Sequence, residues 1–331
     1  MMDFSFCALP GQSARDVVDM VKRAEDAGIP MVWVPDETFM RDPYVLLGAI
    51  AMNTSKIKLG VGIANPYTRH PIQIARAVST IADLCGERVV LGIGAGLKPT
   101  RIAMGAPEGD FTEACRAAIV AMKAVMAGET YSVESDVFSM KDAHMEFTSK
   151  GPVDIYVATT HPRAFEMAGE VADGAIVGNV GRPDALRRII EWTHNGARKA
   201  GRDPSELKIV AWNFALCGDD PTKLYDTIRR ITGLTIANSH SEVTGMLGVS
   251  KEQVTSIREL MRSNPETIPA DVVTNEMIDM IALVGDDGTV RERLKTLSDA
   301  GADIFGMRPS LEILENFDFE AMIHRVWHAS A

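Results

Sequence analysis

Short apolar runs alternate with longer amphipathic segments along most of the chain. Residues 4–9 are apolar and end at a proline and a glycine, whereas in residues 13–27 the apolar side chains recur at three- and four-residue spacing. The first pattern predicts a buried strand. The second predicts an amphipathic helix that Ser13 caps and Gly28 ends.

Eight predicted strands alternate with seven predicted helices. The strands are residues 4–9, 31–34, 57–63, 89–93, 154–158, 175–177, 208–216 and 303–307. The helices are residues 13–27, 44–52, 71–84, 112–126, 162–172, 184–200 and 290–300. Apolar strands of this kind indicate a parallel sheet buried on both faces, which an open, doubly wound fold also has. Eight units without a change of composition, with glycine and polar residues at the strand ends, favour an α/β fold of the (β/α)8 TIM-barrel type.

Two segments depart from this repeat. Residues 130–148 alternate polar and apolar side chains, which predicts a small antiparallel ribbon. Residues 220–284 form a mostly helical insertion after the seventh strand. Such an insertion either covers an active site or a subunit interface, or adds packing helices, and the sequence leaves both open. We therefore expect one barrel domain over residues 1–331, with an insertion at about 220–284.

Composition narrows the class of protein. Hydrophobic residues make up 46% and charged residues 24%, as in ordinary globular proteins. The net charge of −11 disfavours a nucleic-acid partner. The four cysteines form no paired motif and the histidines no metal-ligand spacing, which predicts no metal site. The N-terminus lacks a signal-peptide pattern and no apolar run spans a membrane, so we expect a cytoplasmic protein with no membrane partner.

The carboxyl ends of the strands are where a barrel of this type carries its active site. At the second strand, Asp36 and Glu37 stand between an apolar run and Phe39. Partial burial there would raise a carboxyl pKa and allow proton transfer, so both are candidate catalytic residues. The alternative is that Asp36 caps a turn while Glu37 faces water.

The third strand carries Gly60 and Gly62 inside a buried run. Glycines in that setting mark a bulge or the close approach of a ligand, although tight packing within the barrel would also require them. The predicted cofactor contacts here are Gly62, Ile63, Ala64 and Asn65. At the fourth strand, Gly92, Gly94 and Gly96 do not match the dinucleotide fingerprint. Gly94 is instead expected to leave open backbone beside the cofactor ring.

The fifth strand leads into Pro162 at the start of a predicted helix. Free N–H groups, hydroxyl groups and the helix dipole at such a point predict a phosphate site, to which Arg163 could add. The small residues that end the sixth strand could line its other side. We interpret the histidine of this set as a helix cap. The candidate residues are Thr159, Thr160, His161, Gly178 and Asn179.

Two segments resemble the coenzyme F-420-dependent branch of the luciferase-like superfamily. They are residues 57–96, IKLGVGIANPYTRHPIQIARAVSTIADLCGERVVLGIGAG, and residues 168–179, AGEVADGAIVGN. The resemblance extends from Phe4 to Pro309 and implies the bacterial luciferase-like type of TIM barrel. It implies a non-prolyl cis bond at Gly62-Ile63 or its neighbour, behind a deazaflavin ring. It also implies a coenzyme phosphate at the fifth and sixth strand ends.

Three positions differ from what the resemblance implies. Many members of this branch have Asp-His where this chain has Asp36-Glu37. Members that reduce methanopterins carry acids where Cys7 and Leu97 stand. We hypothesise that Glu37 takes over part of the role of the two acids that are missing at these positions.

The implied activity is hydride transfer between coenzyme F-420 and a small organic or pterin-type substrate. Reduction of methylene-tetrahydromethanopterin is the most specific candidate. An FMN-dependent monooxygenase of the same superfamily and a non-catalytic barrel binding protein are the alternatives. The resemblance also implies a homodimer or homotetramer.

Overall fold

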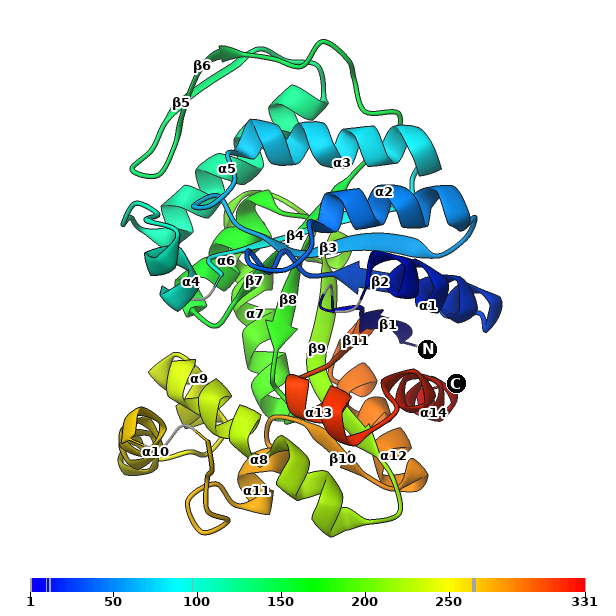
Figure 1. The fold of residues 1–331 in the computed structure, drawn as a ribbon. Helices are drawn as coiled ribbons and strands as arrows, with labels where there is room; N and C mark the ends of the chain where they lie inside the picture. Colours follow the sequence, from blue (N-terminus) through cyan, green and yellow to red (C-terminus); the bar gives the residue numbers. More distant parts are fainter. Residues whose placement is uncertain (1, 10, 12, 97, 264–265, 331) are drawn as a thin grey trace.

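A closed ring of eight parallel strands forms the centre of the computed structural model, which describes residues 2–9, 11, 13–96, 98–263 and 266–330 (Figure 1). Pairing of β1 with β11 and of β8 with β9 closes the ring, so the predicted (β/α)8 barrel is confirmed. The barrel strands are β1 (Asp3–Cys7), β2 (Met31–Val34), β3 (Lys58–Ala64), β4 (Val89–Gly94), β7 (Asp154–Thr159), β8 (Gly174–Gly178), β9 (Lys208–Cys217) and β11 (Ile304–Arg308).

Helices cover the outside of this ring, and the predicted bounds agree with the observed ones to within three residues. The expected cap is present, since the Ser13 side chain accepts a hydrogen bond from the Asp16 N–H. The outer helices are α1 (Ala14–Asp26), α2 (Pro43–Asn53), α3 (Pro71–Cys85), α5 (Phe111–Met126), α6 (Pro162–Val171), α7 (Pro183–Lys199) and α12 (Asp287–Asp299). No described helix is long and apolar enough to cross a membrane.

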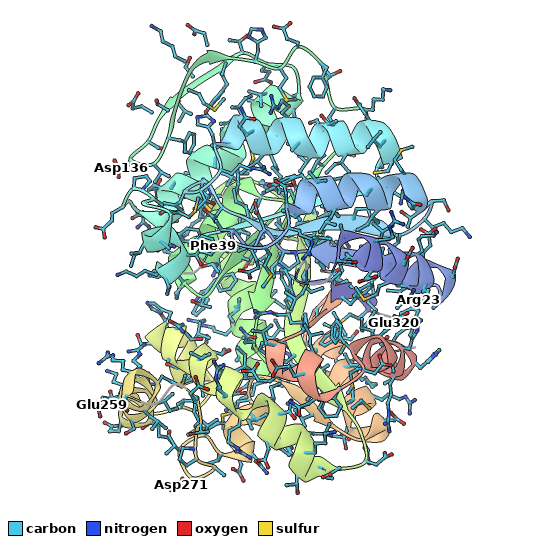
Figure 2. All side chains as sticks on the ribbon, in the orientation of Figure 1. Arg23, Phe39, Asp136, Glu259, Asp271 and Glu320 are labelled. Carbon is cyan, nitrogen blue, oxygen red and sulfur yellow. The ribbon has the colours of Figure 1, made fainter. Side chains whose placement is uncertain are left out.

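Several short elements were not predicted from the sequence. They are α4 (Lys98–Ala103), a 3-10 turn η1 (Pro204–Glu206), β10 (Leu283–Gly285) beside β9, and two C-terminal helices, α13 (Leu311–Asn316) and α14 (Phe319–Ser330). The last helix is held to α1 by Arg23 and Glu320, whose nitrogen and oxygen atoms lie 2.6 and 2.7 Å apart (Figure 2).

The two predicted departures from the repeat are both observed. An antiparallel ribbon of β5 (Tyr131–Glu134) and β6 (Ser139–Ala143) lies outside the barrel. Between β9 and β10 the insertion forms α8 (Pro221–Asn238), α9 (Ser241–Met246), α10 (Lys251–Ser263) and α11 (Asn275–Asp279). Figure 1 shows α9 and α10 side by side at one edge of the molecule, in yellow.

Two tryptophans fill the inside of the barrel. The rings of Trp33 and Trp212 stack with centroids 5.4 Å apart, and both side chains are buried. A Cβ atom at Gly62 would lie 2.5 Å from the Trp212 ring, and one at Gly60 would overlap the Trp33 ring. The glycines of β3 are therefore required by packing inside the barrel.

The helices that follow β7 and β8 also depend on glycine. Where α6 crosses α7, a Cβ at Gly169 would overlap the Thr193 carbonyl, and one at Gly196 would overlap the Glu166 carbonyl. Backbone cannot move aside as a side chain can, so these glycines set the distance between the two helices. The start of α6 and the turn before α7 are thereby held in place.

We expect Gly196→Ala to lower the free energy of unfolding by about 1 to 3 kcal/mol, because overpacking here acts on backbone atoms. Gly48→Ala in α2 is the matched control, since a Cβ there meets nothing within 4 Å. That control should gain about 0.5 to 1 kcal/mol from its helix propensity. Urea unfolding of the two variants measures both changes, and equal effects would contradict the packing argument.

Candidate functional site

The carboxyl ends of the eight strands meet at one end of the barrel, which we call the mouth. Because parallel strands share a direction, the predicted residues from β2, β3, β4, β7 and β8 all come to the rim or floor of this mouth. Cys7, at the end of β1, joins them. Leu97, one of the three positions that differ from what the resemblance implies, lies outside the described residues.

Asp36 and Glu37 occupy different environments after β2. Asp36 is half-buried, and burial raises its pKa to about 6, against the opposing charge of Arg69 and with support from Asp42 and Glu37. Glu37 is exposed at the rim. The cap of α2 is Asp42, whose Oδ1 accepts from the Tyr44 and Val45 N–H groups, so Asp36 does not serve as that cap.

Arg308 is a residue of the mouth that sequence reasoning missed. It ends β11, and its Nη1 donates to the Asn179 Oδ1 at 3.0 Å. Its guanidinium carbon lies 4.8 Å from the centroid of the Phe214 ring. The signal that could have revealed it is its position at the end of the eighth strand, the criterion already applied to the other strands.

The charges around Arg308 come from neighbouring strands. Burial lowers the pKa of Arg308, while Cys7 and Glu37 oppose that shift. Burial also raises the pKa of the Cys7 thiol to about 12, with Arg308 opposing it, so the thiol is neutral at physiological pH. A carboxyl group at the rim, a neutral thiol and a half-buried guanidinium therefore lie along β2, β1 and β11, which are adjacent in the barrel.

The end of β3 is irregular, as predicted. Its pairing with β4 shifts register between Val61 and Ala64, and the Gly62-Ile63 peptide bond is cis. Asn65 is buried, and its Oδ1 accepts from the N–H of Tyr67 at 3.1 Å and of Thr68 at 3.0 Å. The Asn65 side-chain oxygen thus stabilises the turn that follows β3.

The structure favours packing at the β3 glycines, one of the alternatives left open, and corrects the expectation for Gly94. The space left by Gly60 and Gly62 is filled by tryptophan rings. At Gly94, an added Cβ would overlap the Ile63 side chain and lie 2.8 Å from the Ala158 carbonyl oxygen. The Gly94 backbone is therefore covered by Ile63 and is not open to a ring, because the bulge in β3 directs that side chain across β4. Ile63 itself is half-buried at the mouth.

The end of β7 has the local geometry expected of a helix start. The Thr159 Oγ1 accepts from the His161 N–H at 3.0 Å, and the His161 Nδ1 accepts from the Arg163 N–H at 3.3 Å. His161 is thus the N-cap of α6, as predicted. Thr160, which lies between Thr159 and His161 in the sequence, is half-buried.

Arg163 does not face the expected phosphate site. Its guanidinium binds Asp110 at 2.6 Å and Glu113 at 2.8 Å, so these two carboxylates turn it towards α5. The physical reason is local charge: two acids at the start of α5 attract the guanidinium more strongly than the start of α6, whose helix dipole repels a cation. The suggestion that Arg163 adds to a phosphate site is therefore wrong for this conformation.

The end of β8 contacts Arg308 through Asn179. Gly178 is half-buried, and Asn179 has a φ of 61°, which directs its side chain to Arg308. The next residue, Val180, is held by Asn213 of β9, whose Oδ1 accepts from the Val180 N–H at 2.9 Å and whose Nδ2 donates to the Val180 carbonyl at 3.0 Å. Asn213 is a supporting residue that the sequence pattern did not reveal.

The insertion reaches the mouth at His161. The centroids of the His161 and His240 rings lie 4.4 Å apart, and His240 is the N-cap of α9. Burial and the neighbouring His240 lower the pKa of His161. Among the described residues, no group of three histidine, cysteine or acidic side chains could hold a metal ion.

The model of the luciferase-like monooxygenase family matches residues 2–303. This chain belongs to that family. The 5,10-methylenetetrahydromethanopterin reductases of Methanolobus tindarius and Archaeoglobus fulgidus are 29% and 30% identical to it, over 91% of this chain and 92% and 91% of their own lengths. The structure of the coenzyme F-420-dependent tetrahydromethanopterin reductase from Methanopyrus kandleri has a TM-score of 0.85 at 24% identity, covering 98% of this chain and 97% of that one.

Asp36→Asn should stabilise the protein at pH 7.5 but not at pH 4. The folded state binds a proton at Asp36 between pH 3.8 and about 6, so stability from this group falls as the pH rises through that window. Above it, the amide avoids the cost of a half-buried carboxylate, about 1 to 2 kcal/mol after allowance for solvent. Urea unfolding at the two pH values measures the difference. Asp26→Asn, at an exposed position, should change neither value, and a pH-independent effect at Asp36 would contradict this account.

Proposed function

We propose that this protein is a coenzyme F-420-dependent oxidoreductase, with 5,10-methylenetetrahydromethanopterin as the first candidate substrate. The observation that carries the proposal is the similarity to two such reductases over nine-tenths of this chain and of theirs. The family model, which matches residues 2–303, likewise includes every strand end of the mouth except that of β11.

The residues of the mouth suit a deazaflavin with an attached phosphate. Ile63 offers a half-buried apolar surface at the irregular end of β3. The start of α6 offers Thr159, Thr160 and a helix dipole for the phosphate. Gly178 and Asn179 would complete that side. We keep Gly62, Ala64, Asn65, Gly94 and His161 as predicted neighbours of the cofactor, whose backbone or cap position supports the contacting residues.

The deazaflavin, when bound, supplies the hydride chemistry. Reduction of a methylene group that bridges two nitrogens takes up one hydride and one proton, so the protein has to deliver the proton. Glu37 is an exposed carboxyl group at the rim, and it interacts electrostatically with Arg308, whose pKa it raises. We assign proton transfer to Glu37 and a supporting role to Asp36, which holds a proton up to about pH 6.

Arg308 would orient an oxygen atom of the ligand. A guanidinium has five N–H donors, and the one hydrogen bond found for Arg308 among the described residues is that to Asn179. Because a half-buried cation without a carboxylate partner is costly, donors left free at the mouth favour an electron-rich ligand group there.

Titration with both cofactors tests the proposed function. We expect quenching of F-420 fluorescence at micromolar or lower protein concentration and no stable complex with FMN. The alternative, an FMN-dependent monooxygenase, predicts tight FMN binding with oxygen consumption. That result, with no F-420 binding, would overturn the proposal, and binding of neither cofactor would favour the non-catalytic barrel.

Glu37→Gln should lower the turnover number by ~10²–10⁴-fold while leaving F-420 affinity unchanged, because the amide keeps the shape but cannot transfer a proton. Glu206→Gln, at the opposite end of the barrel, is the matched control and should retain the wild-type rate. A wild-type rate in Glu37→Gln would remove this residue from the mechanism. Steady-state kinetics with reduced F-420 and the methylene pterin measures both.

We also infer one domain over residues 1–331, with 220–284 as its insertion, in a cytoplasmic homodimer or homotetramer. Support for self-association comes from α2, which is apolar on all sides. Val45 and Met52 on its outer face are 73% and 68% exposed. A helix apolar all round is usually buried, so a second copy would fit this face.

A further inference from the structure

A cavity of about 560 Å³ lies within the insertion, between α9 and α10. Its wall combines small and hydroxyl-bearing residues with two basic side chains. The residues that matter for the argument are Ser241, Thr244, Gly248, Ser250, Lys251 and Arg258. We call it the α9–α10 cavity.

The α9–α10 cavity adjoins both halves of the proposed phosphate site. On one side, His240 directly precedes Ser241 of the wall, and its ring contacts that of His161 at the start of α6, with an angle of 57° between the two rings. On the other side, a Cβ at Gly248 of the wall would lie 3.4 Å from the Nη1 of Arg182, in the turn after β8. A ligand whose phosphate is bound at the ends of β7 and β8 could therefore extend a further substituent from that phosphate into this cavity.

The basic residues of the cavity lack acidic partners. Among the described residues, neither Lys251 nor Arg258 forms an ion pair. Arg258 is half-buried and donates through Nε to the Ala237 carbonyl at 2.8 Å, which leaves its other nitrogens available. Two cations without an ion pair in the described structure therefore lie at one cavity of a chain whose net charge is −11.

The acids close to the cavity do not neutralise it. Glu252 senses the charge of Lys251, but Lys251 is a minor influence on the lowered Glu252 pKa, behind backbone and Ser250 hydrogen bonds. Glu259 is exposed and points outward from α10 (Figure 2). Glu242, in the first turn of α9, acts on His161, where its charge opposes the lowering of the His161 pKa. The lining itself, among the described residues, contains Lys251 and Arg258 and no acidic residue, which favours an anionic ligand.

We propose that the α9–α10 cavity binds the acidic tail of the coenzyme, the chain of glutamyl carboxylates that extends from the phosphate of F-420. This proposal rests on the proposed function. Lys251 and Arg258 pair with the carboxylates, and the hydroxyl groups of Ser241 and Ser250 supply further hydrogen bonds. Once the ring and phosphate are bound, the tail binds at a high effective concentration, so even weak ion pairs contribute to affinity.

A second cavity cannot take this role. It has a volume of about 340 Å³ and lies between α5 and the ribbon. Its lining includes Asp110, Glu113, Glu134 and Asp136, which repel carboxylates.

The test compares two forms of the coenzyme, one with several glutamates and one with the phosphate but no glutamate. We expect Lys251→Glu to weaken binding of the tailed form about 5- to 50-fold, because an attraction becomes a repulsion. Binding of the form without glutamate should change less than twofold. Arg258→Gln should act in the same direction, and added salt should reduce the difference between the two forms. Fluorescence titration measures all of these constants without turnover.

Arg262→Glu is the matched control, because it makes the same change of charge on an exposed residue of α10 outside the cavity. It should affect both forms less than twofold. Equal losses for the two forms, or no loss for the tailed form, would overturn the tail assignment while leaving F-420 binding intact. A wild-type protein that binds neither form would overturn the proposed function and this inference with it.

Discussion

The stacking of Trp33 on Trp212 inside the barrel is the constraint on which the mouth depends. Two indole rings leave no room for side chains on the facing side of β3, so Gly60 and Gly62 are required there. Trp33 is fixed further by a hydrogen bond from its Nε1 to the Ser5 Oγ at 3.1 Å, and Ser5 in turn donates to the Phe305 carbonyl at 3.0 Å. The rings thus connect β2 and β9 to β3, β1 and β11 across the barrel.

The irregular end of β3 follows above these rings. The register shift between Val61 and Ala64 turns Ile63 over β4, where only glycine at position 94 leaves room for it. A ligand at the mouth would therefore meet Ile63 and not the glycines. The glycine pattern located the correct strand ends, although its physical cause is packing between side chains of the barrel.

Charge at the mouth is organised from strands far apart in the sequence. Arg308 of β11 donates a hydrogen bond to Asn179 after β8. The charges of Cys7 in β1 and Glu37 after β2 oppose the lowering of the Arg308 pKa. The insertion adds a second basic region outside the mouth, connected to it through His161 and His240. An anionic ligand could thus bind at several points along one path, even though the protein carries a net negative charge.

The sequence by itself determined the order of strands and helices, the ribbon, the insertion and the strand ends that form the mouth. These follow from periodicity and local capping, which act over a few residues: Ser13, for example, caps α1 as its position predicts. Tertiary structure alone decided what the side chains do. Arg163 is drawn to Asp110, Gly94 makes room for Ile63, and Arg308 joins the site, because each depends on partners more than 30 residues away in the sequence. Local patterns carry no record of such contacts, so the sequence could locate the mouth, but the contacts of its side chains had to come from the fold.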